Sequence, residues 1–507
     1  MESRTKKSAK NIVFSILFQL ITIGSNFVVK TAFIRFMGIQ YAGMSALFVD
    51  ILGVLSLAEL GFGMAISYAL YAPLHTGDEK RIIKLLNYYK KIYRVVAAVV
   101  FGGGLICLPF LGVLIKDAPD IKENLALVFI LFVLKTVASY LFIYKTTLLE
   151  ANQEKNIISI VGIISTLIGT GAEVFAIAFL KNYVLYLVIS VLVILFRNIA
   201  VSFVAEKRFC FLKGMDNETL TKEERKEITK DVAAVSIYKI GGTIQISADS
   251  IVISAMLGTV SVGLLSCYKL ITSNVDRLFG QIFESMRASV GNLAVSADEH
   301  HQNVVFDRMC FLSFIIGNFI CCATFNLITP FINIWLGKEY ILGIEVVSML
   351  VLDAYILTMT RPYENFRIAN RLFHKGKYRP IFMTIINVIL SIWFGKLWGI
   401  FGVLLATVIA RVSTHVWYDP WLIYHYVFKK GYGKYLLTKA KYLLIVVFNC
   451  AIIYIGFSFV NISNIYIDFA ARSIVSLVLP SVIVYALYRK SEEMNGLKRY
   501  IKNLIKK

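Results

Sequence analysis

Several features that are common in soluble enzymes are scarce or missing in this chain of 507 residues. It has only 8 prolines, and its longest polar segment, residues 206–230, is too short to fold as a separate domain. The sequence contains no Walker loop, no H-E-x-x-H motif and no G-x-S-x-G motif. We therefore expect a protein that is not an enzyme. Without an ATP site, any uphill transport by it would need an ion gradient.

Cysteine is also scarce, and its spacing excludes two further roles. The 7 cysteines lie mostly within apolar runs, and no C-x-x-C pair is present. This pattern is typical of buried thiols rather than of a disulfide framework or a metal site. We expect no cofactor and no bound metal.

Apolar residues, in contrast, are abundant. They make up 58% of the chain, too much to be buried inside a soluble globule of this length. The sequence predicts an all-α polytopic membrane protein with about 14 transmembrane helices in two pseudo-symmetric lobes around a central cavity. The first apolar segment lacks a small-residue cleavage site and is interpreted as an uncleaved span. The predicted spans are 11–36, 41–70, 93–115, 124–148, 156–179, 183–205, 231–256, 260–294, 309–336, 343–366, 380–397, 399–427, 440–460 and 467–488.

Basic residues outnumber acidic ones, 53 against 32, and give a net charge of +21. Such a charge fits a nucleic-acid or an anionic-lipid partner, and the location of the charges decides between them. They cluster in alternate loops and in the tail, whereas the opposite loops hold little beyond Lys116, Lys122, Lys181 and Lys338. This asymmetry follows the positive-inside rule. It predicts a multi-pass protein of the cytoplasmic membrane with both termini in the cytoplasm, in contact with membrane lipids and not with nucleic acid.

Polar residues inside the apolar segments repeat at steps of three and four, so they lie on one face of each helix. One such stripe runs along Asn11, Ser15, Gln19, Thr22, Asn26 and Lys30. A second includes Ser236, Lys239, Thr243, Ser247, Ser250 and Ser254, and a third includes Lys269, Ser273, Asp276, Gly280, Glu284 and Arg287. A membrane helix has no use for a polar face unless water or solute runs along it. We expect these three faces to line the central cavity.

Charged residues within the spans are the candidate site residues, because a charge at the bilayer centre costs about 2.5–3.5 kcal/mol unless it is paired or faces water. The predicted substrate-binding cations are Lys30, Arg35, Lys239, Lys269 and Arg277. The predicted coupling or charge-pairing acids are Asp50, Glu59, Asp249 and Asp276, and the predicted gate is Arg361, Pro362 and Glu364. Simpler roles stay open: interface anchoring for Lys30, Arg35 and the gate, and structural pairing for the acids.

A short glycine motif indicates an internal duplication. Gly38 and Gly43 follow the first span, and Gly258 and Gly263 follow the seventh, at an offset of 220 residues. Six spans and a basic loop separate the copies, so both have the same orientation, and two such bundles can rock to give alternating access. We predict an N-terminal lobe at 1–206, a basic cytoplasmic linker at 207–230, a C-terminal lobe at 231–430, and two additional helices with a basic tail at 431–507.

Several sequence blocks belong together as a family signature. They are Tyr238 to Thr243, Ala248 to Ser254, Pro330 to Tyr340, Arg361-Pro362, Lys377 to Ile381, Gly399 to Leu405 and Trp417 to Pro420. In these blocks the chain resembles Wzx-type polysaccharide flippases, most strongly between about 235 and 430. The resemblance implies membership of the multidrug/oligosaccharidyl-lipid/polysaccharide exporter superfamily. It also implies a substrate, an undecaprenyl-pyrophosphate-linked oligosaccharide that is moved from the inner to the outer leaflet for capsule, O-antigen or exopolysaccharide assembly. From the same resemblance we expect H⁺ or Na⁺ as the coupling ion. We also expect a polysaccharide polymerase and glycosyltransferases as partners.

Four alternatives differ in substrate or class. A lipid II flippase shares the polyprenyl pyrophosphate, and a drug/cation antiporter of the same superfamily would favour an acidic, aromatic cavity. A membrane glycosyltransferase or polymerase would need catalytic acids in a large external loop, which this chain does not offer. A structural scaffold would have no use for charges in mid-membrane.

Overall fold

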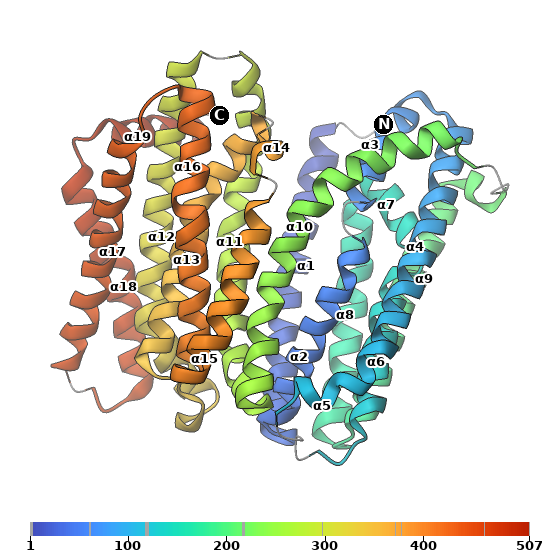
Figure 1. The fold of residues 1–507 in the computed structure, drawn as a ribbon, viewed down its shortest axis with the longest axis horizontal. Helices are drawn as coiled ribbons and strands as arrows, with labels where there is room; N and C mark the ends of the chain where they lie inside the picture. The colour runs from blue at the N-terminus through green and yellow to red at the C-terminus, as the bar shows by residue number, and fades with distance from the viewer. Residues whose placement is uncertain are drawn as a thin grey trace. The chain divides into compact units, whose positions relative to one another are not determined.

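The computed structural model describes residues 4–59, 62–116, 121–214, 219–296, 298–370, 372–376, 378–460 and 462–505. Every regular element in these ranges is a helix. The chain forms two compact units, Met1–Ser266 and Cys267–Lys507. Within each unit the long helices lie side by side, as Figure 1 shows. The predicted all-α class is confirmed.

The first unit contains ten α-helices and the start of an eleventh in its described residues. They are α1 (Arg4–Ala32), α2 (Ile39–Leu55), α3 (Phe62–Thr76), α4 (Glu79–Cys107), α5 (Leu111–Leu114), α6 (Leu125–Tyr140), α7 (Ile143–Ala151), α8 (Lys155–Ala178), α9 (Tyr183–Arg208), α10 (Lys222–Leu257) and α11 (Thr259–Ser296). Short π or 3₁₀ turns lie at η1 (Phe33–Met37), η2 (Ser56–Glu59), η3 (Leu108–Phe110) and η4 (Cys210–Gly214).

The second unit contains the rest of α11 and eight further α-helices in the part of the chain that is described. They are α12 (Glu299–Trp335), α13 (Ile344–Ala369), α14 (Phe373–Gly376), α15 (Arg379–Arg411), α16 (Trp417–Ile423), α17 (Gly433–Ser458), α18 (Ile465–Tyr488) and α19 (Glu492–Ile505). The turns are η5 (Lys338–Tyr340), η6 (Val412–Val416) and η7 (Tyr424–Phe428), of which η6 and η7 are π-helical.

Side-chain caps fix where the long helices begin. The carboxylate of Asp78 accepts the N–H of Arg81 at the start of α4, and that of Asp298 accepts the N–H of His301 at the start of α12. Thr221 and Glu224 form a reciprocal capping box at the start of α10. These caps satisfy backbone donors that the first helical turn leaves unpaired.

Each predicted span lies on a helix or on a broken helix. Among the described residues, eight helices are long and apolar enough to cross a membrane, and α6 with α7, bent by 41°, makes a ninth candidate. The other predicted spans coincide with α2–α3, α10, α11 and α13, which are interrupted or carry more charge than a simple apolar span. The protein is therefore a multi-pass membrane protein, and its charged helices are the ones on which the sequence places the site.

The long element Arg379–Phe428 holds two of the predicted spans rather than one. Gly399 has φ +60° and ψ −136°, a conformation that breaks the helix and favours glycine. The side-chain amide of Asn387 donates to Thr407 Oγ1 at 2.9 Å. In a straight helix these residues would lie about 30 Å apart. The chain therefore folds back at Gly399, as the predicted boundary between 397 and 399 requires.

The two compact units separate within α11, at Ser266, whereas the predicted lobe boundary lies in the segment 207–230. The second half of that segment is helical, because α10 begins at Lys222. The lobe boundaries given above stay a prediction.

Candidate functional site

The two glycine motifs meet each other in the first unit. A Cβ on Gly43 of α2 would lie 1.9 Å from the carbonyl oxygen of Thr259, and a Cβ on Gly263 of α11 would lie 2.6 Å from that of Ile39. Ile39 and Thr259 are themselves separated by the repeat offset, so the contact is reciprocal. The preceding glycines, Gly38 and Gly258, both have positive φ. The close crossing of α2 and α11 therefore uses glycine for two reasons, backbone conformation and helix approach.

Lys30 lies beside this crossing of α2 and α11. Its Nζ donates to Ser266 Oγ at 2.5 Å, which joins the last turn of α1 to the first part of α11. Arg35, in η1, is exposed. Of these two predicted cations, Lys30 thus contacts α11, another of the predicted cavity helices, whereas Arg35 is exposed.

Three of the predicted acids belong to the first unit, on elements that pack together. Asp50 on α2 is half-buried and Asp249 on α10 is buried, and α2 and α10 are neighbours. Glu59, in η2, accepts a hydrogen bond from the hydroxyl of Tyr93 at 2.7 Å. The Glu59 contact holds η2 against α4, which favours a structural role for this residue.

A polar seam joins α11 to α13 in the second unit. One guanidinium nitrogen of Arg361 donates to both carboxylate oxygens of Asp276, at 2.9 and 2.8 Å, and Glu364 lies 3.9 Å from the same guanidinium. A Cβ on Gly280 would lie 3.2 Å from Arg361. The glycine of the predicted stripe thus gives the arginine room to lie across α11. A residue predicted to pair charges and a residue predicted to form a gate make one ion pair.

The seam continues along the same helix pair. The side-chain amide of Asn365 donates to the carbonyl of Phe283 at 2.8 Å, and Arg287 pairs with Glu284 at 2.5 Å. Asn365 is 2% exposed and was not among the predicted site residues. It lies one helical turn after Arg361, on the same face of α13. This spacing is the sequence feature that could have marked Asn365 as a site residue. Only the packing of α13 on α11 shows its partner.

The helix pair α11 and α13 carries five basic and five acidic side chains, so it is less cationic than the sequence suggests. They are Lys269, Arg277, Arg287, Arg361, Arg367, Asp276, Glu284, Glu345, Asp353 and Glu364. Lys269 is half-buried and Arg277 is exposed. The side chain of Lys239, the remaining predicted cation, lies outside the described part of the structure.

A second charged cluster lies deeper in the same unit and was not predicted as a site. Asp419 in α16 is 1% exposed and pairs with Arg367 at 3.3 Å and with Arg379. Arg411 pairs with Asp353 at 2.5 Å. Arg379 and Asp419 each precede a proline, and each lies in a sequence block that carries the family resemblance. This shared position is the sequence feature that could have pointed to the cluster. The two blocks meet in one buried ion pair.

The described residues contain no group of three or more His, Cys, Asp or Glu side chains placed to hold a metal ion. The charged groups are instead arranged in ion pairs between helices. Such pairs allow charges to remain within membrane helices, because each partner offsets part of the other's desolvation cost.

This arrangement is that of an all-α, multi-pass membrane protein. No protein-family model and no curated protein sequence matches the chain. Among solved structures, the lipid II flippase MurJ in an inward closed conformation matches with a TM-score of 0.67 and 16% identity, over 94% of this chain and 99% of that chain. The MATE multidrug transporter DinF-BH matches with a TM-score of 0.59 and 15% identity, over 85% and 98%. An inward-facing MATE family transporter of the MOP superfamily matches with a TM-score of 0.56 and 13% identity, over 78% and 92%. These similarities establish a shared fold, and the Wzx-type resemblance stays a prediction.

Proposed function

We propose that this protein is a membrane flippase of the multidrug/oligosaccharidyl-lipid/polysaccharide exporter superfamily. In this proposal it moves undecaprenyl-pyrophosphate-linked oligosaccharides from the inner to the outer leaflet by alternating access, driven by a H⁺ or Na⁺ gradient. The observation that carries the proposal is the polar seam between α11 and α13 in a chain with the fold of MurJ.

The charges favour an anionic head group. Lys269 and Arg277 belong to the same helix as Asp276, whose carboxylate is already paired with Arg361. Together α11 and α13 carry five basic and five acidic residues, and Lys269 and Arg277 are the proposed substrate-binding cations among them. In a low-dielectric site an ammonium or guanidinium attracts a phosphate far more strongly than it does in water. In the first unit, Lys30 is a further proposed substrate-binding cation, and Asp50 and Asp249 are proposed to pair charges or to carry the coupling proton.

Lipid II is the second candidate substrate, and one observation favours it. The match to the lipid II flippase MurJ covers 99% of that chain, with the highest TM-score of the three matches given above. An organic cation is less favoured, because the predicted substrate-binding side chains of the first, seventh and eighth spans are basic. The two lipid substrates share a polyprenyl pyrophosphate and differ in the sugars that it carries.

The test is a translocation assay in proteoliposomes. We would add a lipid-pyrophosphate-linked oligosaccharide, lipid II or an organic cation, each with and without a pH or sodium gradient, and measure the fraction that becomes accessible outside. The proposal expects movement of the oligosaccharide above empty liposomes, increased by one gradient. Movement of lipid II alone would assign the second candidate, and movement of the cation alone would overturn the flippase proposal.

Lys239→Ala and Lys269→Ala test the proposed cations. Each is expected to lower translocation at least tenfold, the equivalent of about 1.4 kcal/mol, at normal levels of folded protein. Lys338→Ala is the matched control, since Lys338 is exposed in η5. If the Lys269 variant instead loses expression, that lysine serves folding and not binding. Normal translocation by both variants would contradict their proposed role.

A further inference from the structure

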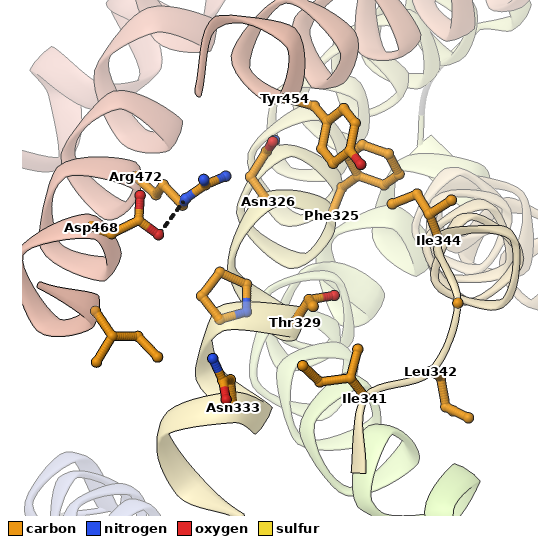
Figure 2. A pocket seen from close by; sticks show the side chains of 13 residues that line it. Phe325, Asn326, Thr329, Asn333, Ile341, Leu342, Ile344, Tyr454, Asp468 and Arg472 are labelled. Carbon is orange, nitrogen blue, oxygen red and sulfur yellow. Dashed lines mark hydrogen bonds and ion pairs between the residues drawn. The ribbon is translucent and has the colours of Figure 1, made fainter. Parts of the chain in front are cut away.

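A cavity of about 460 Å³ lies in the second unit, away from the polar seam. Its size falls in the range of small-molecule sites, about 300–1,000 Å³. Figure 2 shows it between α12, the start of α13, α17 and α18. Neither the predicted site residues nor the proposed function uses it.

Asn326 of α12 carries the polar end of this cavity. It is 2% exposed, and its amide donates to the carbonyl of Cys322 at 3.0 Å. Among the residues that the structure describes, no donor reaches its Oδ1. Pro330, four residues later, also has no N–H to give to the backbone carbonyl of Asn326. A buried acceptor without a partner costs about 1–3 kcal/mol, which a ligand with a donor would recover.

Arg472 and Asp468 of α18 contribute a charged pair that is neutral as a whole. Nε of Arg472 donates to Asp468 at 2.8 Å, and each side chain is 18% exposed. Figure 2 shows the guanidinium pointing from α18 towards Asn326. These are the only charged residues among those that line the cavity, so its described wall has no net charge. A pyrophosphate is therefore disfavoured here.

The rest of the wall combines neutral polar groups with aromatic rings. Thr329 and Asn333 follow Asn326 along one face of α12. Phe325 and Tyr454 form an edge-to-face pair with centroids 5.6 Å apart. A sugar ring fits this chemistry, because its hydroxyls both donate and accept while its C–H face packs on aromatic side chains.

We infer that this cavity binds a neutral hexosyl unit. Because the inference rests on the proposed function, the sugar is assigned to the lipid-linked substrate rather than to a free sugar. In the topology predicted from the basic loops, the cavity lies at the outer ends of α12 and α17. The sugar would therefore be held on the side to which it is delivered.

Photolabelling tests the inference without any transport assay. The full-length protein in phospholipid nanodiscs, free of sugar detergents, would be labelled with a diazirine derivative of octyl glucoside, and the labelled peptides mapped by mass spectrometry. Asn326→Leu and Thr329→Val are expected to lower labelling of α12 and α18 at least tenfold. Thr324→Val, the same change on the same helix outside the cavity, should leave it unchanged. Labelling elsewhere, or labelling that persists in folded Thr329→Val, would overturn the site.

Competition identifies the ligand. Unlabelled octyl glucoside should compete, and free glucose should compete much less if an attached lipid is required. Equal competition by an alkyl phosphocholine would overturn the saccharide assignment in favour of a phospholipid head group, and equal competition by free glucose would overturn the lipid-linked assignment. Labelling in the cavity by a protein that flips no lipid-linked sugar would refute the proposed function and leave the saccharide site in place.

Discussion

Asp419 is the residue whose loss should damage the fold most. Its carboxylate is 1% exposed and pairs with both Arg367 and Arg379. Removing one partner of a buried ion pair costs about 3–5 kcal/mol, because a buried charge is left without compensation. Asp419→Asn is expected to reduce the yield of monodisperse protein and to lower the Tm in detergent.

Glu299→Gln is the matched control for that variant. Glu299 also pairs with a basic residue, Lys429, at 2.5 Å, but the two side chains are 50% and 70% exposed. Exposed ion pairs contribute about 0–1 kcal/mol. Equal melting temperatures for Asp419→Asn and Glu299→Gln would contradict the importance of the buried pair.

Glu224 offers a test by pH. Its carboxylate accepts the backbone N–H of Thr221 at 2.7 Å and pairs with Arg81, and these two contacts lower the pKa of Glu224. A lowered folded-state pKa stabilises the fold at pH above the unfolded value of about 4.3, and the contribution is lost as the pH falls through the folded pKa. Glu224→Gln should therefore lower the Tm at pH 7, and the difference should disappear as the pH falls below the folded-state pKa of Glu224. A difference that is independent of pH would show that the charge of Glu224 has no part in it.

Individual residues also show what the sequence could not predict. Periodicity identified Asp276, Gly280 and Glu284 as one helical face, because the helix period is local in sequence. Their partners could not be identified in this way, since Arg361 is 85 residues from Asp276. Pairing between helices depends on packing, and a single sequence contains no periodic signal for it.

At the level of helices, the crossing of α2 and α11 is the feature most sensitive to added volume. Gly43→Ala would place a Cβ 1.9 Å from a backbone carbonyl, which cannot move without shifting α11. Overpacking of this kind costs typically about 1–3 kcal/mol. We expect a lower Tm and less folded protein in a fluorescence size-exclusion assay.

Gly24→Ala is the corresponding control, because no atom lies within 4 Å of a Cβ at Gly24 on α1. Alanine is the better helix former by about 1 kcal/mol, so this variant should be as stable as the wild type or more stable. A Gly43→Ala protein that matches Gly24→Ala in stability would mean that the two glycine motifs do not cross closely.

The helices themselves were largely predictable. Apolar runs and basic loops gave spans that coincide with helices, including the break at Gly399. The start of α10 could not be predicted, because residues 222–230 are polar and have the composition of a linker. The Thr221 cap starts the helix there, before the apolar segment begins.

For the whole molecule, orientation in the membrane is the prediction on which the proposed direction of transport and the position of the sugar cavity both depend. The exposed residues Lys80 and Lys430 belong to basic loops, and the exposed residues Lys122 and Lys338 to the sparsely charged ones. Single cysteines at these positions, in a background without the seven native cysteines, can be treated with a membrane-impermeant maleimide. We expect labelling of Lys122→Cys and Lys338→Cys in intact spheroplasts, and of Lys80→Cys and Lys430→Cys only after permeabilisation.

Lys338 closely precedes Ile341 and Leu342 of the cavity wall, so its labelling would also place that cavity at the outer surface. The opposite pattern would invert the topology and move the cavity to the cytoplasmic side, where it would meet the substrate before transport.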